Sequence, residues 1–173
     1  IGNLVFMKYL GDAGVGAFGV ACYYLPFVFM FGNAIAESAQ PIVSFNYGLG
    51  RRERVAETLA ISCRTAVIGS LLSIVAFTLF PTLLVGLFIA PAEPAAQIAV
   101  NGFPYFAAGF LFFILNLVAV GFFQSVEKVR PAIVFALLRG AIFMLPCFFL
   151  LPHFIGIKGI WLAMPLTEAA TTL

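Results

Sequence analysis

The sequence predicts an all-α membrane protein, a polytopic bundle of transmembrane helices, and three observations support this. Of 173 residues, 63% are hydrophobic and only 9% are charged, which leaves too little polar surface to cover a soluble domain. The charges gather in short groups, separated by charge-free stretches over residues 13–36, 65–92, 94–126 and 140–157. Each stretch reaches the roughly 18–20 residues that cross a hydrocarbon layer of about 30 Å. The sequence also lacks the alternating pattern of a membrane β-barrel.

The charge-free stretches define the expected helices in chain order. Ile1–Tyr9 is the end of a first span, and a last partial span begins near Gly156. Between them lie four full spans: Gly14–Gly48, Thr58–Ile89, Ala95–Gln124 and Pro131–Leu151. Gly and Pro residues occupy the links, as expected of helix ends. We interpret residues 1–173 as one transmembrane domain. We expect it to be an internal piece of a longer protein, because it opens without an initiator Met and stops inside an apolar helix.

Basic residues are divided unequally between the two ends of the predicted bundle. Successive links alternate sides, and Lys8 and Lys158 fall on one side. The other side holds seven residues: Arg51, Arg52, Arg54, Arg64, Lys128, Arg130 and Arg139. The positive-inside rule places this second group in the cytoplasm, which predicts a multi-pass protein of the cell (inner) membrane. Arg139 lies about 12 Å inward from Pro131. We expect its long side chain to reach back to the cytoplasmic surface.

The span Gly14–Gly48 carries a polar stripe in its cytoplasmic half. It would be about 52 Å long, so it must protrude, tilt or kink, and Pro41 predicts a kink near Glu37. Four polar residues recur at helical spacing on one face: Asn33, Glu37, Gln40 and Ser44. A carboxyl group in apolar surroundings costs roughly 2.5–3.5 kcal/mol and usually faces a cavity or a partner. Glu37 is therefore a candidate proton or cation site in a water-accessible groove. The alternative is an interfacial Glu37 that is solvated or paired with an arginine.

Two further groups are candidates for substrate or ion binding. Glu168 follows Lys158 by ten residues, which brings it about 15 Å into the membrane, where a carboxylate has a functional or paired role. The span Ala95–Gln124 places Tyr105, Gly109, Phe112, Phe113 and Asn116 at helical spacing. That face could line a site for an amphipathic cation through cation–π attraction. Ordinary helix packing is the alternative, and it is the interpretation we favour for this face. Arg139 is a further candidate for substrate or ion binding.

No nucleotide-binding loop, metal-ligand cluster or nucleophile–base pair is present in the sequence. We therefore expect no enzymatic activity, no cofactor, no metal site and no nucleic-acid partner. The three cysteines, Cys22, Cys63 and Cys147, are scattered through apolar stretches without redox or metal spacing. They are expected to pack as small apolar residues.

Three motifs resemble the MATE (multidrug and toxic compound extrusion) transporters. The stretch from Gln40 to Gly48, followed by the basic run Arg51–Val55, resembles the end of their eighth helix. The other two resemble the MepA-like branch. One runs through Phe122, Phe123, Gln124 and Ser125 to Lys128, Arg130, Pro131 and Ala132. The other comprises Leu151, Pro152, Gly156, Ile157, Gly159, Ile160, Trp161 and Pro165.

The resemblance implies a twelve-helix fold of two six-helix lobes, of which this chain is the C-terminal half, from late helix 7 to mid helix 12. It implies alternating access, with efflux of drug-like compounds coupled to inward movement of H⁺ or Na⁺. The implied partners are the lipid bilayer, small-molecule substrates and the missing N-terminal lobe of the same polypeptide. Some branches carry an acidic cation ligand in their tenth helix. The corresponding span Ala95–Gln124 contains no Asp or Glu, which favours H⁺ over Na⁺ as the coupling ion.

Two other functions are compatible with parts of the sequence. A lipid-linked oligosaccharide flippase of the same superfamily would present a more cationic cavity, which only Arg64 and Arg139 could supply here. A non-transporting membrane scaffold would have no need of the intramembrane carboxylate Glu37. A secondary multidrug antiporter accounts for more of these features than either.

The division of basic residues predicts the orientation of the links. Single cysteines introduced at Gly50 and at Ala92, in full-length protein lacking the native cysteines, are treated in intact cells with an impermeant thiol reagent. We expect labelling at position 92 and none at position 50, because the Arg51–Arg54 link is cytoplasmic. Labelling at position 50 and not at 92 would contradict the orientation.

Overall fold

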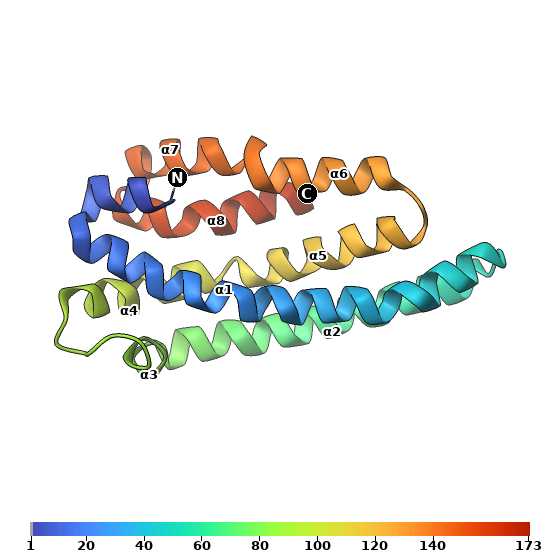
Figure 1. Ribbon diagram of the computed structural model, residues 1–173, viewed down its shortest axis with the longest axis horizontal. Helices are drawn as coiled ribbons and strands as arrows, with labels where there is room; N and C mark the ends of the chain where they lie inside the picture. Colours follow the sequence, from blue (N-terminus) through green and yellow to red (C-terminus); the bar gives the residue numbers. More distant parts are fainter. Residues whose placement is uncertain (1) are drawn as a thin grey trace.

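The computed structural model describes residues 2–173, and within them the only secondary structure is helical (Figure 1). The all-α fold class is therefore confirmed. In chain order the elements are α1 (Gly2–Gly48), α2 (Arg52–Leu79), α3 (Pro81–Gly86), α4 (Pro94–Ala107), α5 (Phe110–Ser125), α6 (Val129–Leu137), the π-helical segment η1 (Leu138–Ile142), α7 (Met144–Ile155) and α8 (Ile157–Thr172). The expected first segment, Ile1–Tyr9, is helical from Gly2 on, and Ile1 lies outside the described residues.

The helices that could cross a membrane coincide with the predicted full spans. Among residues 2–173, three helical stretches are long and apolar enough: α1, α2 and the combined stretch Val129–Ile155. The pair α4 and α5 makes a fourth when it is taken as one bent span. The last predicted span begins as expected, with α8 at Ile157.

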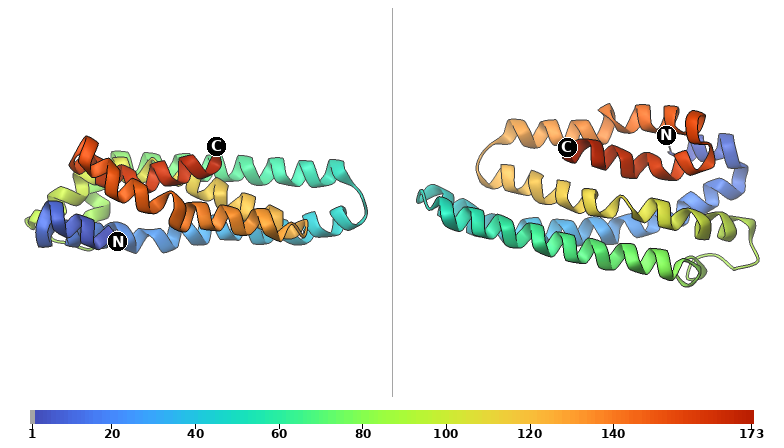
Figure 2. Two further views of the ribbon diagram at one scale, coloured as in Figure 1. Left: turned by 90° about the horizontal axis from the view of Figure 1, so that it is seen from above. Right: turned by 180° about the vertical axis from the view of Figure 1, so that it is seen from behind.

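The long helices lie side by side along the long axis of the molecule (Figures 1 and 2). The α1–α2 turn and the α5–α6 link are at the same end. There, buried Val43, Val55 and Val126 pack together with Phe122 against them. The α3–α4 and α7–α8 connections lie at the opposite end (Figure 1). Both basic links are thus at one end of the bundle, as the alternation of links predicts. Which side of the membrane this end faces stays a prediction.

Two of the expected continuous spans are interrupted. The helix that was expected over Thr58–Ile89 begins earlier, at Arg52, and ends at Leu79. The reason is Pro81, which has no backbone N–H and disfavours a helical conformation in the residue before it. Phe80 accordingly has φ −122° and ψ 37°, and the short α3 follows. In α1, helical angles continue through Pro41, where we expected a kink. The break in α1 is at Gly11, with φ 63° and ψ −158°, between the expected segments Ile1–Tyr9 and Gly14–Gly48.

The span expected over Ala95–Gln124 is bent by 49° between α4 and α5. Pro104 cannot donate a hydrogen bond to the helix, which weakens the turn before the break. At the break itself, the Gly109 N–H bonds to the carbonyl of Phe106, three residues back. Gly109 also lies against α8, since a Cβ atom added there would be 2.8 Å from Pro165 Cα. The bend therefore lets α8 approach the backbone of α5.

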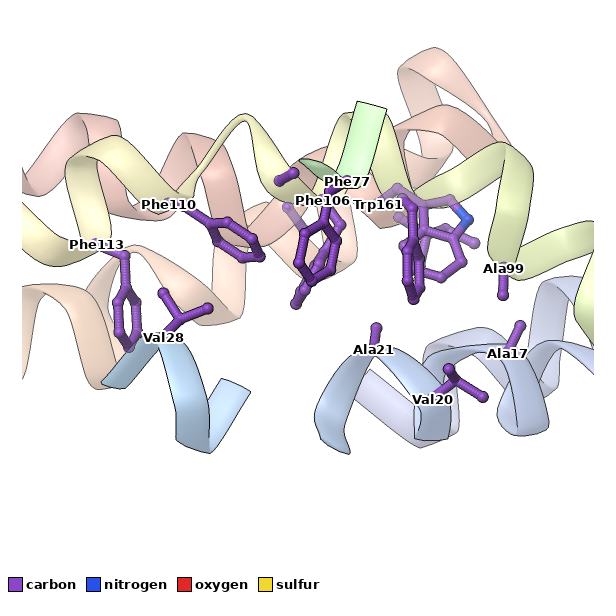
Figure 3. Close-up of a cluster of buried hydrophobic side chains, with 14 of the residues drawn as sticks. Ala17, Val20, Ala21, Val28, Phe77, Ala99, Phe106, Phe110, Phe113 and Trp161 are labelled. Atoms are coloured by element: carbon purple, nitrogen blue, oxygen red, sulfur yellow. The ribbon is translucent and has the colours of Figure 1, made fainter. Parts of the chain in front are cut away.

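The apolar core consists of bulky aromatic side chains facing small ones (Figure 3). The ring of Phe77 on α2 lies 5.2 Å from that of Phe103 on α4 and 5.0 Å from that of Phe110 on α5, between centroids. In Figure 3, buried Ala21 of α1 points toward the aromatic side chains, and buried Ala17 lies opposite Ala99 of α4. Such aromatic pairs contribute about 0.5–1.5 kcal/mol each beyond their buried area. In a membrane, where lipid is as apolar as the core, this close packing holds helices together.

A close contact between α1 and α5 predicts a destabilising substitution. A Cβ atom at Gly121 would lie 2.7 Å from Ala36 Cβ, and neither side chain can rotate away. Gly121→Ala should therefore force the helices apart and cost about 1–3 kcal/mol, measured as a lower melting temperature of the full-length protein in detergent. Gly19→Ala is the matched control, because nothing lies within 4 Å of a Cβ atom there. An unchanged melting temperature for Gly121→Ala would contradict the packing.

Candidate functional site

A buried ion pair joins the middle of the Val129–Ile155 stretch to α8. Arg139 of η1 donates to Glu168 Oε1 through Nη2 at 2.9 Å and through Nε at 3.1 Å. The side chains of Arg139 and Glu168 are 15% and 5% exposed. The guanidinium also lies over the ring of Phe113 on α5, with Cζ 4.5 Å from the ring centroid. The arginine is thus held by a carboxylate on one element and an aromatic face on another.

Asn116 of α5 completes the cluster. Its Nδ2 donates to Glu168 Oε2 at 2.8 Å and to the backbone carbonyl of Glu168 at 3.0 Å. Its Oδ1 accepts a hydrogen bond from the Thr172 hydroxyl at 3.0 Å. Both carboxylate oxygens of Glu168 therefore have donors, which is the condition for a buried charge to be tolerated. We call Asn116, Arg139 and Glu168, together with the exposed Thr172 at their edge, the buried polar cluster.

The π-helical segment places Arg139 in this cluster. In η1 the Phe143 N–H bonds to the carbonyl of Leu138, five residues back, at 2.9 Å. Two residues favour this irregular turn. Gly140 lowers the helical preference, and Pro146 cannot donate to the carbonyl of Ile142. Segments of this type widen a helix locally and occur often at functional sites.

The expectation that Arg139 reaches back to the cytoplasmic surface is wrong. The guanidinium stays inside the bundle because it pairs with the buried carboxylate of Glu168. This pairing replaces the solvation that water at the membrane surface would supply. Arg139 was one of the seven basic residues assigned to one side of the membrane. It lies inside the bundle and not at that end. The expectation that Glu168 has a partner is met by the same contact.

The polar stripe of α1 lines a groove. A cavity of about 340 Å³ lies between α1, α5 and the α6–η1 stretch. We call it the polar groove. Its lining residues are Phe29, Asn33, Ala36, Glu37, Gln40, Leu117, Val120, Gly121, Gln124, Ala136 and Arg139. Asn33 Nδ2 donates to Glu37 Oε1 at 2.7 Å, so the carboxylate is oriented by its neighbour one turn earlier. Glu37 is exposed, whereas only 15% of the Arg139 side chain is exposed.

Ser44, the fourth member of the stripe, is not in the groove. Its hydroxyl donates to the backbone carbonyl of Ser125 at 2.9 Å and ties the end of α1 to that of α5. That contact gives Ser44 a packing role. The functional roles of Asn33, Glu37 and Gln40 stay predictions.

The expected aromatic face on Ala95–Gln124 is divided by the bend at Ala108–Gly109. Tyr105 lines a different cavity of about 460 Å³ with Lys158 and Trp161, and Lys158 Nζ is 5.7 Å from its ring centroid. Phe112 is half-buried and lines neither of these two cavities. Phe113 contacts Arg139 rather than a guest cation. The bend of 49° thus separates Tyr105 from Phe112 and Phe113, and a binding role for these side chains stays a prediction.

Three residues of the cluster and the groove were not predicted as site residues from the sequence. Thr172 joins the buried polar cluster, and its spacing of one helical turn from Glu168 was a usable signal. Gln124 and Phe29 line the polar groove. Gln124 belongs to one of the quoted motifs. Its position beside α1 depends on how the helices pack, which the motif does not indicate.

Comparisons with known proteins identify relatives of this arrangement. The profile of the MatE family matches residues 1–150, and a comparison with curated proteins found no match. A solved MOP superfamily transporter from Pyrococcus furiosus, described as having a binding pocket of reverse polarity that suggests a different function, is similar, with a TM-score of 0.89 and 13% identity. The similarity covers 99% of this chain and 39% of that one.

Structures of a multidrug resistance MATE family transporter are similar in both of its conformations. The outward-facing structure has a TM-score of 0.86 and 15% identity, over 99% of this chain and 39% of that chain. The inward-facing one has the same score and identity, over 99% and 40%. At these identities the likeness shows the fold, and the chain spans about two-fifths of the length of these transporters.

The buried ion pair predicts a non-additive effect on stability. Glu168→Leu or Arg139→Leu alone leaves one charge without its partner and should lower the free energy of unfolding by about 3 kcal/mol. The double variant Arg139→Leu with Glu168→Leu should recover most of that loss, because two apolar side chains replace both charges. Thermal unfolding of the detergent-solubilised full-length protein measures each variant.

The exposed pair Arg54–Glu57, with side chains 69% and 58% exposed, supplies the control. Glu57→Leu should change stability by less than about 1 kcal/mol, since solvent screens such pairs. A double variant as unstable as the sum of the two buried single variants would contradict the coupling of Arg139 and Glu168.

Proposed function

Because the chain belongs to the MatE family, we propose that it is part of a secondary active multidrug efflux antiporter of the cell (inner) membrane. It exports cationic or amphipathic compounds by alternating access in exchange for H⁺. Residues 1–173 supply a single transmembrane domain, the part of the C-terminal lobe from late helix 7 to mid helix 12, and the same polypeptide supplies the N-terminal lobe. The family match over residues 1–150 and the 39% coverage of the Pyrococcus furiosus transporter support this reading.

The polar groove carries the proposal. It combines one exposed carboxylate, Glu37, with amide side chains from α1 and α5 and an aromatic wall at Phe29. Arg139, the one basic residue of its lining, is already neutralised by Glu168. The groove therefore retains the uncompensated negative charge of Glu37. Such a site attracts a cation, and the surrounding apolar residues Leu117 and Val120 accommodate its hydrophobic part.

Exchange follows when two cations compete for one carboxylate. A cationic compound binds beside ionised Glu37, with its apolar part against the groove wall. A proton that reaches Glu37 removes the negative charge and releases the compound. Occupation by a proton and by the compound are mutually exclusive. Opposite movement of the two is therefore coupled when the protein changes sides only with Glu37 occupied by one of them. Asn33 supports either state, because its amide donates to Glu37 Oε1 and need not move when Oε2 is protonated.

The buried polar cluster has a positioning role in this scheme. Arg139 both pairs with Glu168 and borders the groove, so the cluster fixes the wall opposite Glu37. Substitution of Glu168 should therefore alter transport through the shape and charge of that wall, and not through direct proton exchange at the substrate site.

A flippase for anionic lipid-linked sugars is the second reading. The similar structure from Pyrococcus furiosus is described as having a binding pocket of reverse polarity that suggests a different function. We therefore use the charge of the groove to choose between the two readings. Here the charge balance of the polar groove disfavours an anionic substrate, because the guanidinium of Arg139 already bonds to a carboxylate. A scaffold role does not explain the groove or the carboxylate of Glu37 exposed in it.

The groove predicts the effect of neutralising Glu37. In the full-length transporter, Glu37→Gln should preserve expression, because it keeps the shape of the side chain. It should lower proton-driven efflux of a cationic dye roughly tenfold or more, since a charge-assisted contact contributes about 1.5–3 kcal/mol. Efflux of a neutral substrate should fall less. The measurement is dye uptake into inverted vesicles, which corresponds to efflux from the cell, across pH 6 to 8 and driven by imposed H⁺ or Na⁺ gradients.

Glu57→Gln is the matched control, because Glu57 is exposed on α2 and paired with Arg54; its efflux should equal that of the wild type. Wild-type efflux of the cationic dye by Glu37→Gln would show that Glu37 is an interfacial carboxylate. Efflux driven by a Na⁺ gradient and not by a H⁺ gradient would overturn the choice of coupling ion.

A further inference from the structure

A separate cavity lies at the end of the bundle that carries the basic links. Its volume is about 750 Å³. It is bounded by the α1–α2 turn, the first part of α2, the last part of α5 and the residue before α6. We call it the basic-end cavity. Its lining residues are Tyr47, Gly50, Arg52, Val55, Ala56, Leu59, Phe122, Phe123, Val126 and Lys128.

The lining of the basic-end cavity is divided into an apolar floor and a cationic rim. Val55 and Val126 are buried, and Leu59, Phe122 and Phe123 are half-buried. Arg52 and Lys128 are exposed, and they come from opposite sides of the cavity, one from α2 and one from the α5–α6 link. Neither belongs to the ion pairs found among residues 2–173, which are Arg54–Glu57 and Arg139–Glu168.

The acidic neighbours do not neutralise this rim. Glu53 and Glu127 adjoin Arg52 and Lys128 in the sequence, yet neither forms an ion pair with them in the described part of the chain. Arg51 and Arg130 add further positive charge at the same end. The cavity therefore offers two free cations above an apolar surface.

This cavity is distinct from the polar groove. On α5 the groove is lined by Leu117, Val120, Gly121 and Gln124, whereas Phe122, Phe123 and Val126 line the basic-end cavity. At about 100° per residue, these two sets lie on opposite faces of the helix. A ligand in the basic-end cavity is therefore separated from the polar groove by the full width of α5.

We propose that the basic-end cavity binds the headgroup of an anionic phospholipid. The phosphate lies between Arg52 and Lys128, and the glycerol and upper acyl chains lie against Leu59, Phe122 and Phe123. The charge complementarity of the rim selects an anionic headgroup, and the apolar floor selects a ligand that carries acyl chains. Basic pockets between transmembrane helices are suited to such headgroups. By contacting α2 and the α5–α6 link together, the lipid reinforces the apolar contacts of Val55 with Val126 and Phe122 at this end.

The test uses full-length protein in neutral detergent, with phosphatidylglycerol as the probe and phosphatidylcholine and inorganic phosphate as comparisons. Phosphatidylglycerol should raise the melting temperature in a saturable way, and neither comparison should reproduce the rise. The double variant Arg52→Gln with Lys128→Gln should weaken the apparent affinity for phosphatidylglycerol by roughly 10- to 30-fold, as expected for two lost cationic contacts. Native mass spectrometry of retained lipid gives a second measure on the same samples.

The control is Arg54→Gln with Arg130→Gln, which removes the same charge from the same end without changing the lining of the cavity. It should keep the wild-type affinity. Leu59→Asn, which keeps both cations and makes the floor polar, should weaken binding of the lipid. An equal loss in the control would overturn the proposal in favour of general attraction to anionic lipid. An equal shift with inorganic phosphate would show a phosphate site that ignores the acyl chains. No response of the wild type to phosphatidylglycerol would also overturn it.

Discussion

The buried pairing of Arg139 with Glu168 is the interaction on which the arrangement of the C-terminal helices depends. Helices in a bilayer have no hydrophobic force that draws them together, so they are held by packing and by polar contacts. This pair, with Asn116, connects η1, α5 and α8 at one point. A buried carboxylate in that position is tolerable only while its partners stay in place. The constraint therefore sets the register of three elements at once.

The spans were predictable because charge is excluded from the membrane regardless of how helices pack. The charge-free stretches therefore located α1, α2, the α4–α5 pair and the Val129–Ile155 stretch. The interruptions were harder to place, although their residues were visible. Pro81 ends α2, whereas Pro26 and Pro41 leave helical angles intact in α1. The same residue type thus has different outcomes, because neighbouring helices and turns decide whether a lost hydrogen bond becomes a break.

Contacts between different helices also limited the prediction of the candidate site. Helical periodicity brought Asn33, Glu37 and Gln40 onto one face, and the structure lines one groove with them. The sequence also singled out Arg139, Glu168 and Asn116, but as separate candidates. Their contacts join residues 29 and 52 positions apart, and spacing within one helix carries no information about such pairs. The argument from sequence placed the Arg139 guanidinium in water at the membrane surface, whereas in the structure it bonds to the buried carboxylate of Glu168 on α8.

The positions of the tight contacts and the breaks suggest how such a chain would move during alternating access. Gly121 against Ala36 and the Ser44–Ser125 hydrogen bond tie α1 to α5, and the buried polar cluster ties α5 to α8. These three helices are therefore expected to move together. At the end of the bundle away from the basic links, the backbone breaks between α2 and α3 at Phe80 and between α7 and α8 at Gly156 (Figure 1). Bending at these two breaks would change the distance between the helix ends there, while Glu37 and Arg139 keep their places along the groove. A motion of that kind can expose one carboxylate to either side of the membrane in turn, which is what competition between a proton and a cationic compound requires.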